Sequence, residues 1–473
     1  MSLLRNLFAR QPHDRERLPT DGVPLRRVLG VGGLVAVGLG TMLGGIFTTV
    51  GSGANAAGPA VIASFGLAGL TCLFVALCYA ELASMVPIAG SAYTYGYAAL
   101  GEVVAWIIGW DLILEYGISV APLSATLSGA LQQLLAKAGL ALPAWAQQGN
   151  VVVTLHGIDI AHSQVDLIAA AAVVLLSIVL AIGIRESAAT NVVLVVVQVV
   201  AIVTFVLVLG GAVHPGAYRP FAPLGGHGIV IGAALVFFAY IGFDTVTVAS
   251  EEARNPVRDV PRAIIISLIV GAVLFMAAAA VTVGVVPWDK VAASSGMVDA
   301  VVKNGGSDLF FALVLAGTVT GAAASMLTSL LGQIRILYVM ARDRMIPPVF
   351  GRVSARTRTP VAITLITGLV VALFAAGLPL AVLLEFVNIG TLSAFVIVCA
   401  GVMVLRFSRP DAVRPFRVPF GPVAVPAIGI ALCVWLTVEG LKPATWLRFL
   451  IWFAVGIAVY ALYGYRHSLL RER

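Results

Sequence analysis

The chain contains twelve long apolar segments, and this feature limits its fold more than any other. A helix needs about 20 apolar residues to cross the hydrocarbon core of a bilayer. Hydrophobic residues make up 60% of the 473 residues and charged residues only 11%, whereas soluble domains are about 25% charged. The sequence therefore predicts an all-α integral membrane protein with about twelve transmembrane helices. The predicted spans are approximately 27–53, 59–85, 99–131, 165–184, 190–212, 228–250, 262–286, 308–340, 360–378, 380–405, 422–440 and 446–465.

The positive charges are concentrated on one side of the predicted membrane. The termini and the loops after even-numbered helices carry 23 of the 29 lysine and arginine residues. Because cytoplasmic loops are enriched in lysine and arginine, we expect a multi-pass protein of the cytoplasmic membrane with both termini in the cytoplasm. Residues 1–10 are interpreted either as a short amphipathic helix on the membrane surface or as a disordered tail. The net charge of +7 thus reflects topology, and no nucleic-acid partner is expected.

Two apolar segments, one in each half of the chain, carry glycine at their centres. The first contains GLGTMLGGIF at 38–47, and the sixth contains FFAYIGFD at 237–244. An opened helix is tolerated inside a membrane only where it is buried in protein or lines a cavity. In many transporters two discontinuous helices meet near the midplane and bind the substrate. The pattern predicts such a site, although Gly40 and Gly44 also fit close helix packing.

Four motifs occur in order along the chain: CYAELASMVPIAGSAYTYGYAALGE, GWDLILEYG, FFAYIGFD with SEEARNPVRDVPRAI, and LTSLLGQIRILYVMARDRMIP. Together they resemble bacterial relatives of the cationic amino acid transporters, which belong to the amino acid, polyamine and organocation superfamily. The resemblance covers almost the whole chain. It implies a LeuT-type fold with two inverted repeats of five helices and two peripheral helices. The implied parts are a cytoplasmic segment 1–26, the repeats 27–212 and 228–406, the last two helices 422–465 and a cytoplasmic tail 466–473.

The same resemblance implies a free amino acid as the substrate and a site between the first and sixth helices. Backbone amides of the first helix would bind the substrate carboxylate, and backbone carbonyls of the sixth would bind its ammonium group, as the helix dipoles favour. The amides are those of Thr41, Met42, Gly44 and Gly45, and the carbonyls are those of Phe238, Ala239 and Ile241. One departure is that the family pattern G-x-G-I-F is shortened to G-G-I-F at residues 44–47.

Three polar residues inside predicted helices are candidates for coupling transport to an ion gradient. Gln198 aligns with a lysine of proton-coupled relatives, and its amide cannot titrate. Glu115 and Asp244 are intramembrane acids, which are functional candidates by default. Asp111 and Glu115 are four residues apart and would share one face of an α-helix. Facilitated diffusion, exchange, and proton coupling through Glu115 or Asp244 all remain open, as does a structural hydrogen-bonding role for these side chains.

Several motifs of other functional classes are absent from the sequence. It has no G-x-x-x-x-G-K-[ST], H-E-x-x-H or G-x-S-x-G pattern, so neither ATP-driven transport nor enzyme activity is predicted. No cofactor and no metal are expected. Since backbone contacts recognise groups that all amino acids share, the sequence does not select one substrate. The alternative function is a membrane-embedded amino-acid sensor or interaction subunit that keeps the fold without transport.

Two local expectations concern the loops. Residues 132–164 are expected to form a connector with a short helix. After the sixth helix, Pro256 and Pro261 predict an interruption, because proline inside a helix removes a hydrogen bond and clashes with the preceding turn.

Overall fold

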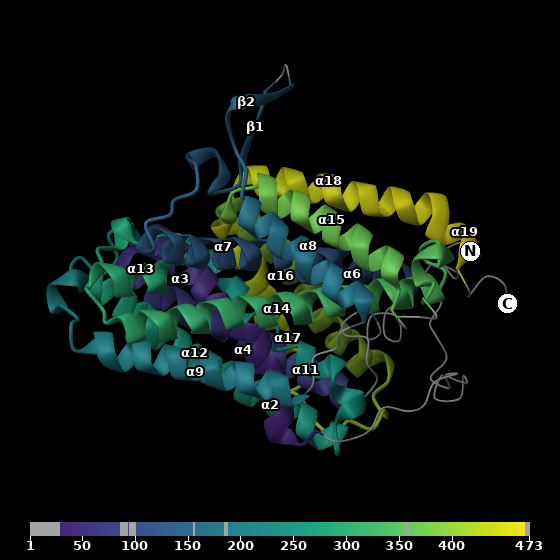
Figure 1. Ribbon diagram of the computed structural model, residues 1–473. Helices are drawn as coiled ribbons and strands as arrows, with labels where there is room; N and C mark the ends of the chain where they lie inside the picture. The colour runs from purple at the N-terminus through teal and green to yellow at the C-terminus, as the bar shows by residue number, and fades with distance from the viewer. Residues whose placement is uncertain are drawn as a thin grey trace.

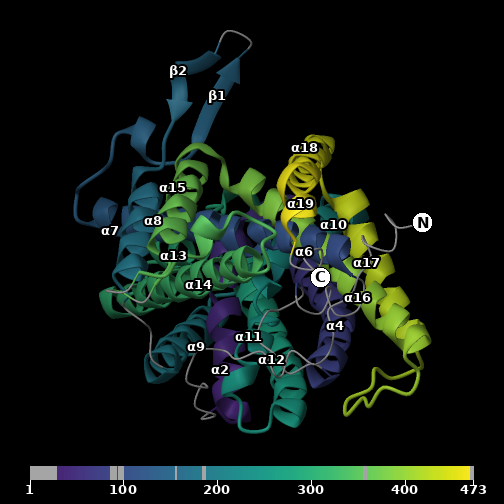
Figure 2. The same cartoon turned by 90° about the vertical axis from the view of Figure 1, so that its right-hand side faces the viewer.

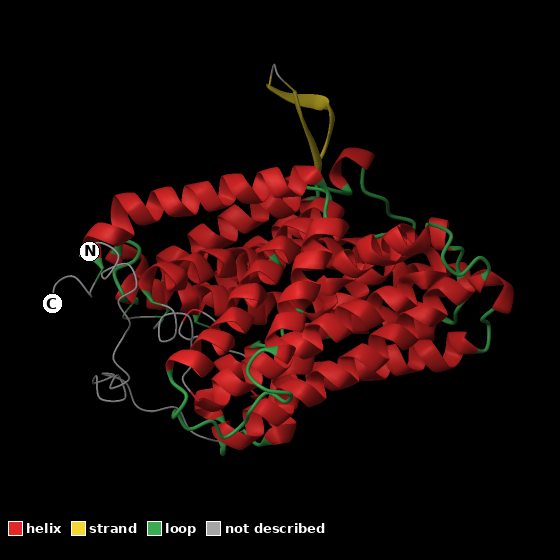
Figure 3. Ribbon diagram, turned by 180° about the vertical axis from the view of Figure 1, so that it is seen from behind, coloured by secondary structure: helices red, strands yellow, loops and turns green. Residues whose placement is uncertain are grey.

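The computed structural model describes residues 29–85, 93, 101–154, 157–183, 188–354, 357 and 359–468. These residues form a bundle of helices, from which one β-hairpin projects (Figure 3). Eight of the described stretches are long and apolar enough to cross a membrane. They are Val31–Met85, Glu102–Lys137, Thr190–Gly210, Gly225–Thr247, Pro256–Val285, Asp308–Arg342, Leu380–Ser408 and Pro443–His467. The chain is therefore a multi-pass α-helical membrane protein.

Each of the twelve predicted apolar segments is mostly helical in its described part (Figure 1). In the first half of the chain the helices are α2 (Val31–Met42), α3 (Gly44–Ala57), α4 (Val61–Met85), α6 (Glu102–Leu112), the π-helical turn η3 (Ile113–Ile118), α7 (Val120–Lys137), α8 (Leu167–Ile182) and α9 (Ala188–Gly210). The second half contains α10 (Gly225–Val236), α11 (Thr245–Val248), α12 (Pro256–Val285), α13 (Gly296–Lys303), α14 (Asp308–Arg342), α15 (Val361–Gly377), α16 (Leu380–Ser408), α17 (Ala424–Gly440), α18 (Pro443–Val459) and α19 (Tyr465–His467).

Packing between helices depends on small residues that let their backbones approach, as is usual in membrane bundles. A Cβ atom on Gly317 of α14 would lie 2.3 Å from the Cβ atom of Ala201 in α9. The most extensive helix contacts join α4 to α12 and α8 to α15, and α10 packs on α3 and α4. The outer faces carry exposed leucines such as Leu207 and Leu373, which suits contact with lipid.

The loop before α8 differs from the expected connector. It contains the antiparallel strands β1 (Asn150–Thr154) and β2 (Gly157–Gln164), as well as the predicted short helix, a 3-10 turn at Ala144–Ala146. The three consecutive valines of β1 are typical of a strand, because β-branched residues favour the extended backbone.

The predicted interruption is present directly before Pro256, where α11 has ended and α12 has not begun, but it is wrong for Pro261. Helix α12 begins at Pro256 and continues through Pro261 to Val285. Proline is tolerated in the first turn, where its missing N–H would have no intrahelical partner, and one later lost bond does not end a helix of 30 residues. The expectations for residues 1–10 concern a segment outside the described residues.

Candidate functional site

The sixth apolar segment is opened at its centre. Helix α10 ends at Val236 and is followed by the 3-10 turn η6 (Phe237–Tyr240), after which Ile241 is extended and Gly242 has a φ of +117°. Helix α11 resumes at Thr245. Only glycine adopts this backbone conformation without strain, and a Cβ atom on Gly242 would also lie 2.6 Å from Cγ2 of Thr41. Glycine is thus needed both for the turn and for the approach of α2.

The first apolar segment is not opened like the sixth, and its helical pattern changes only at Leu43. Leu43 separates α2 from α3 but keeps right-handed helical angles, and its N–H still bonds to the carbonyl of Leu39 at 2.8 Å. The two glycines that follow allow very close contacts. A Cβ atom on Gly45 would lie 2.4 Å from Cα of Ala239, and one on Gly44 would lie 2.6 Å from the carbonyl oxygen of Gly321.

Six of the seven residues predicted to bind substrate are buried, and they lie on both sides of this contact between the first and sixth helices. Thr41 contacts Gly242, and its hydroxyl lies 3.2 Å from that of Thr245. Gly45 meets the backbone of Ala239. The buried residues are Thr41, Met42, Gly44, Gly45, Phe238 and Ala239, whereas Ile241 is half-buried. The methyl end of Met42 points to Gly271 of α12, so its side chain is part of the helix packing.

Ser325 of α14 holds the segment just before the first interruption. Its hydroxyl donates to the carbonyl oxygen of Thr41 at 2.8 Å and is 3.3 Å from that of Gly40. A side chain of α14 therefore binds carbonyl groups of α2 at the point where the helix ends. Hydroxyl groups are common between membrane helices, so the sequence alone does not distinguish Ser325 from a packing residue.

A group of carboxyl side chains lies beside the opened sixth helix. Asp111 and Glu115 are each 1% exposed, and none of their four carboxylate oxygens has a hydrogen-bond partner among the described residues. Glu115 interacts electrostatically with Asp244 and Asp111. Because a buried charge without a partner is costly, these groups are candidates for exchanging a proton or binding a cation.

The turn that carries Glu115 is not α-helical. Residues Ile113–Ile118 form the π-helical turn η3, and Asp111 and Glu115 still interact with each other, as expected of side chains on one face. π-Helical turns are frequent at functional sites. The next residue, Tyr116, donates a 2.5 Å hydrogen bond to Asp244. The sequence contained no signal for this bond, which joins residues 128 positions apart.

Two buried glutamines have unsatisfied amide groups. Gln198 of α9 and Gln333 of α14 are both 0% exposed, and neither amide has a hydrogen-bond partner within the part of the chain that the structure describes. Gln198 therefore does not make the interhelical hydrogen bond that was its structural alternative. A buried polar group without a partner lowers the stability of the folded state by about 1–3 kcal/mol. These two amides are therefore candidates for a role in function or in another conformation.

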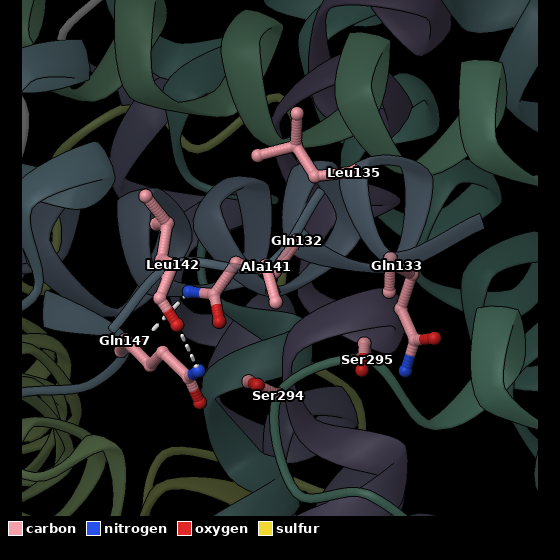
Figure 4. A pocket seen from close by; sticks show the side chains of 10 residues that line it. Gln132, Gln133, Leu135, Ala141, Leu142, Gln147, Ser294 and Ser295 are labelled. Carbon is pink, nitrogen blue, oxygen red and sulfur yellow. Dashed lines mark hydrogen bonds between the residues drawn. The ribbon is translucent and has the colours of Figure 1, made fainter. Parts of the chain in front are cut away.

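A separate cavity lies at the C-terminal end of α7 (Figure 4). Its volume is about 260 Å³, and its lining includes Gln132, Gln133, Gln147, Ser294 and Ser295. The amide of Gln132 donates to the backbone of Gln147 at 2.7 Å. The lining has no charged side chain and none of the predicted site residues, so this cavity is distinct from the contact between the interrupted helices.

Comparison with known proteins agrees with these features. The sequence profile of the amino acid permease family matches residues 29–460. The branched-chain amino acid permease BcaP of Bacillus subtilis (strain 168) is 40% identical over 451 residues, which are 95% of each chain. The methylthioribose transporter of the same organism is 39% identical over 471 residues, 99% of this chain and 100% of the relative. The vacuolar cationic amino acid transporter 4 of Arabidopsis thaliana is 38% identical over 431 residues, 87% of this chain and 68% of the relative.

Proposed function

Because the chain belongs to the amino acid permease family, we propose that it is a secondary transporter that moves free amino acids across the cytoplasmic membrane by alternating access. The observation that carries this proposal is the close contact of the first helix with the opened part of the sixth helix. Gly45 of α3 lies against the backbone of Ala239, next to the opened turn at Gly242. A structural scaffold has no need for an opened membrane helix, whereas a transporter uses one to bind polar groups.

Recognition of the substrate rests on backbone groups in this proposal. In this proposal the substrate carboxylate binds backbone amides of the first helix, those of Thr41, Met42, Gly44 and Gly45. Carbonyls of Phe238, Ala239 and Ile241 accept hydrogen bonds from the substrate ammonium group. Since the relatives are named for branched-chain amino acids, cationic amino acids and methylthioribose, the side chain of the substrate is left to experiment.

The proposed architecture has twelve crossings with both termini in the cytoplasm. Residues 27–212 and 228–406 form two inverted repeats, and residues 422–465 add two peripheral helices. Segments 1–26 and 466–473 are the cytoplasmic ends. This arrangement is supported by the contact between the first and sixth helices, each of which is the first helix of one proposed repeat.

We propose Glu115 as the proton carrier, with Asp244 as the group that senses its charge. The support is the burial of Glu115, its lack of a hydrogen-bond partner among the described residues and its electrostatic interaction with Asp244. Gln198 occupies the position of the lysine in proton-coupled relatives and cannot titrate, so an acid takes over that role in this chain.

The test is uptake of labelled amino acids into proteoliposomes, guided by a thermal-shift screen of the purified protein against the twenty amino acids. A ligand at about 100 times its Kd stabilises a protein by about 2.7 kcal/mol. Transport predicts both a shift and the movement of label across the sealed membrane. Binding without movement would favour the alternative, an amino-acid sensor or interaction subunit.

Coupling is tested with the same vesicles. An imposed inward proton gradient is expected to accelerate uptake by the wild type but not by Glu115→Gln, which should still exchange internal for external substrate. If the proton gradient does not change the rate of uptake by the wild type, proton coupling is contradicted, and exchange or facilitated diffusion are the alternatives.

A further inference from the structure

The loop that joins α16 to α17, residues 409–423, lies at the edge of the bundle. Figure 2 shows it as a bare stretch of chain that extends past α4 and α17. Both neighbouring helices are apolar, so the loop begins and ends at the membrane surface.

The inner side of the loop is fastened to α4 by a buried carboxylate. Glu81 accepts hydrogen bonds from Nε of Arg406 at 2.7 Å, from Nη2 of the same side chain at 2.5 Å and from the backbone of Val418 at 2.7 Å. Nε of Arg414 lies 3.4 Å from Glu81. The guanidinium of Arg414 also donates to the backbone carbonyls of Leu405, Arg409, Pro410 and Ala412. These bonds give the loop a fixed shape.

The outer side of the loop exposes large apolar residues next to positive charge. Val413 is 82% exposed and Phe420 is 86% exposed. Arg417 is exposed, and the structure records no ion pair for it among the described residues; Asp411 is the one exposed acid of the loop. Phe420 has a φ of +60°, which is unfavourable for a residue with a side chain. Neither burial nor backbone preference explains an aromatic residue at position 420.

We propose that this loop binds the membrane surface, with Phe420 and Val413 inserted among the headgroups and Arg417 paired with the phosphate of an anionic lipid. Aromatic residues are favoured at the level of the headgroups, and arginine matches phosphate geometry well. Basic segments next to transmembrane helices are attracted to anionic lipid. Because Glu81 fastens the loop to α4, lipid bound here is connected to the helix that packs on α10 and α12.

The experiment measures the depth of the loop directly. All four native cysteines are buried, so Phe420→Cys can be labelled selectively with an environment-sensitive fluorophore. The matched control is Val353→Cys, a position 50% exposed in the loop before α15. The full-length variants are placed in vesicles of phosphatidylcholine alone or of an equimolar mixture with phosphatidylglycerol, each with and without lipid that carries a shallow spin label.

Contact with anionic lipid predicts that the spin-labelled lipid quenches the fluorophore at 420 about twofold more strongly than at 353, and more strongly still with phosphatidylglycerol. Arg417→Gln should remove the effect of phosphatidylglycerol, and high salt should weaken it. A water-exposed fluorophore at 420 in both kinds of vesicle would overturn the proposal and would favour a protein partner for this face. The readout does not involve transport, so it is independent of the proposed function.

Discussion

The hydroxyl of Tyr116 donates a 2.5 Å hydrogen bond to the carboxylate of Asp244 and so joins the π-helical turn η3 to the opened part of the sixth helix. Glu115, the preceding residue, interacts electrostatically with the same carboxylate. The protonation state of Glu115 therefore influences a group that immediately precedes α11. Asp244 thus links the proposed proton carrier, Glu115, to the proposed substrate site, so a change of charge on Glu115 can affect the opened turn.

Replacing Tyr116 by phenylalanine tests whether its hydrogen bond to Asp244 is needed for transport. Tyr116→Phe removes the hydrogen bond while keeping the ring, and we expect uptake to fall about tenfold. Hydrogen bonds to charged groups contribute about 1.5–3 kcal/mol, so thermal stability should fall as well. Both quantities are measured on the same preparation, by proteoliposome uptake and by thermal unfolding.

The matched control for this variant is Tyr460→Phe. It removes a 2.9 Å bond from a buried tyrosine to Glu102, away from the interrupted helices. Stability should fall by a similar amount while uptake stays close to that of the wild type. Equal uptake by the two variants would show that the bond to Asp244 has no special role.

Gly45, at the contact between the first and sixth helices, has little room for a side chain. In Gly45→Ala the new methyl group would lie 2.4 Å from the backbone of Ala239, so one helix must move. Overpacking of this kind costs about 1–3 kcal/mol, and we expect uptake to be nearly abolished. Gly32→Ala in α2 is the control, because no atom lies within 4 Å of its Cβ position. Normal uptake by Gly45→Ala would contradict a substrate site at this contact.

The sequence was a good guide to the apolar helices and to the opening at Gly242, since length, hydrophobicity and a central glycine are local signals. It was a poor guide to the turn around Glu115. A π-helical turn adds one residue to a helix, which periodicity does not detect in a wholly apolar segment. The hairpin between β1 and β2 has a local signal in the three consecutive valines at 151–153, which are typical of a strand.

Contacts between distant segments could not be predicted in the same way. The bond from Tyr116 to Asp244 and the binding of Arg406 and Arg414 to Glu81 join residues more than 100 positions apart. Each of these residues also has an ordinary local interpretation, in or at the end of an apolar helix or, for Arg414, in a basic loop. Their partners follow only from how the helices pack.

The unsatisfied amide of Gln198 leads to a prediction about stability and function together. Gln198→Leu removes a buried polar group that has no partner among the described residues, so we expect the free energy of unfolding to stay the same or rise by about 1 kcal/mol. Uptake should nevertheless fall if the amide is used in another conformation of the transport cycle.

The comparison for this variant is Asn388→Leu. Its amide donates to the carbonyl of Ala234 at 2.6 Å, so its loss should lower stability by about 1–3 kcal/mol. Thermal unfolding and uptake are measured on both variants. A strongly destabilised Gln198→Leu would mean that the amide is satisfied in the folded protein and would remove the argument for a functional role.

The carboxylate of Glu81 is expected to be among the most important single groups for stability. In Glu81→Gln, Arg406 and Arg414 lose the anion between them, and breaking a buried ion pair on one side costs about 3–5 kcal/mol. The same change should free the loop between α16 and α17, so a fluorophore at position 420 should gain rotational freedom, as measured by its anisotropy. Asp308→Asn, which breaks the exposed ion pair with Lys137, should change neither the unfolding temperature nor the anisotropy. If Glu81→Gln unfolds like the wild type, the buried charges are satisfied without this residue, and lipid bound at the loop has no rigid connection to α4.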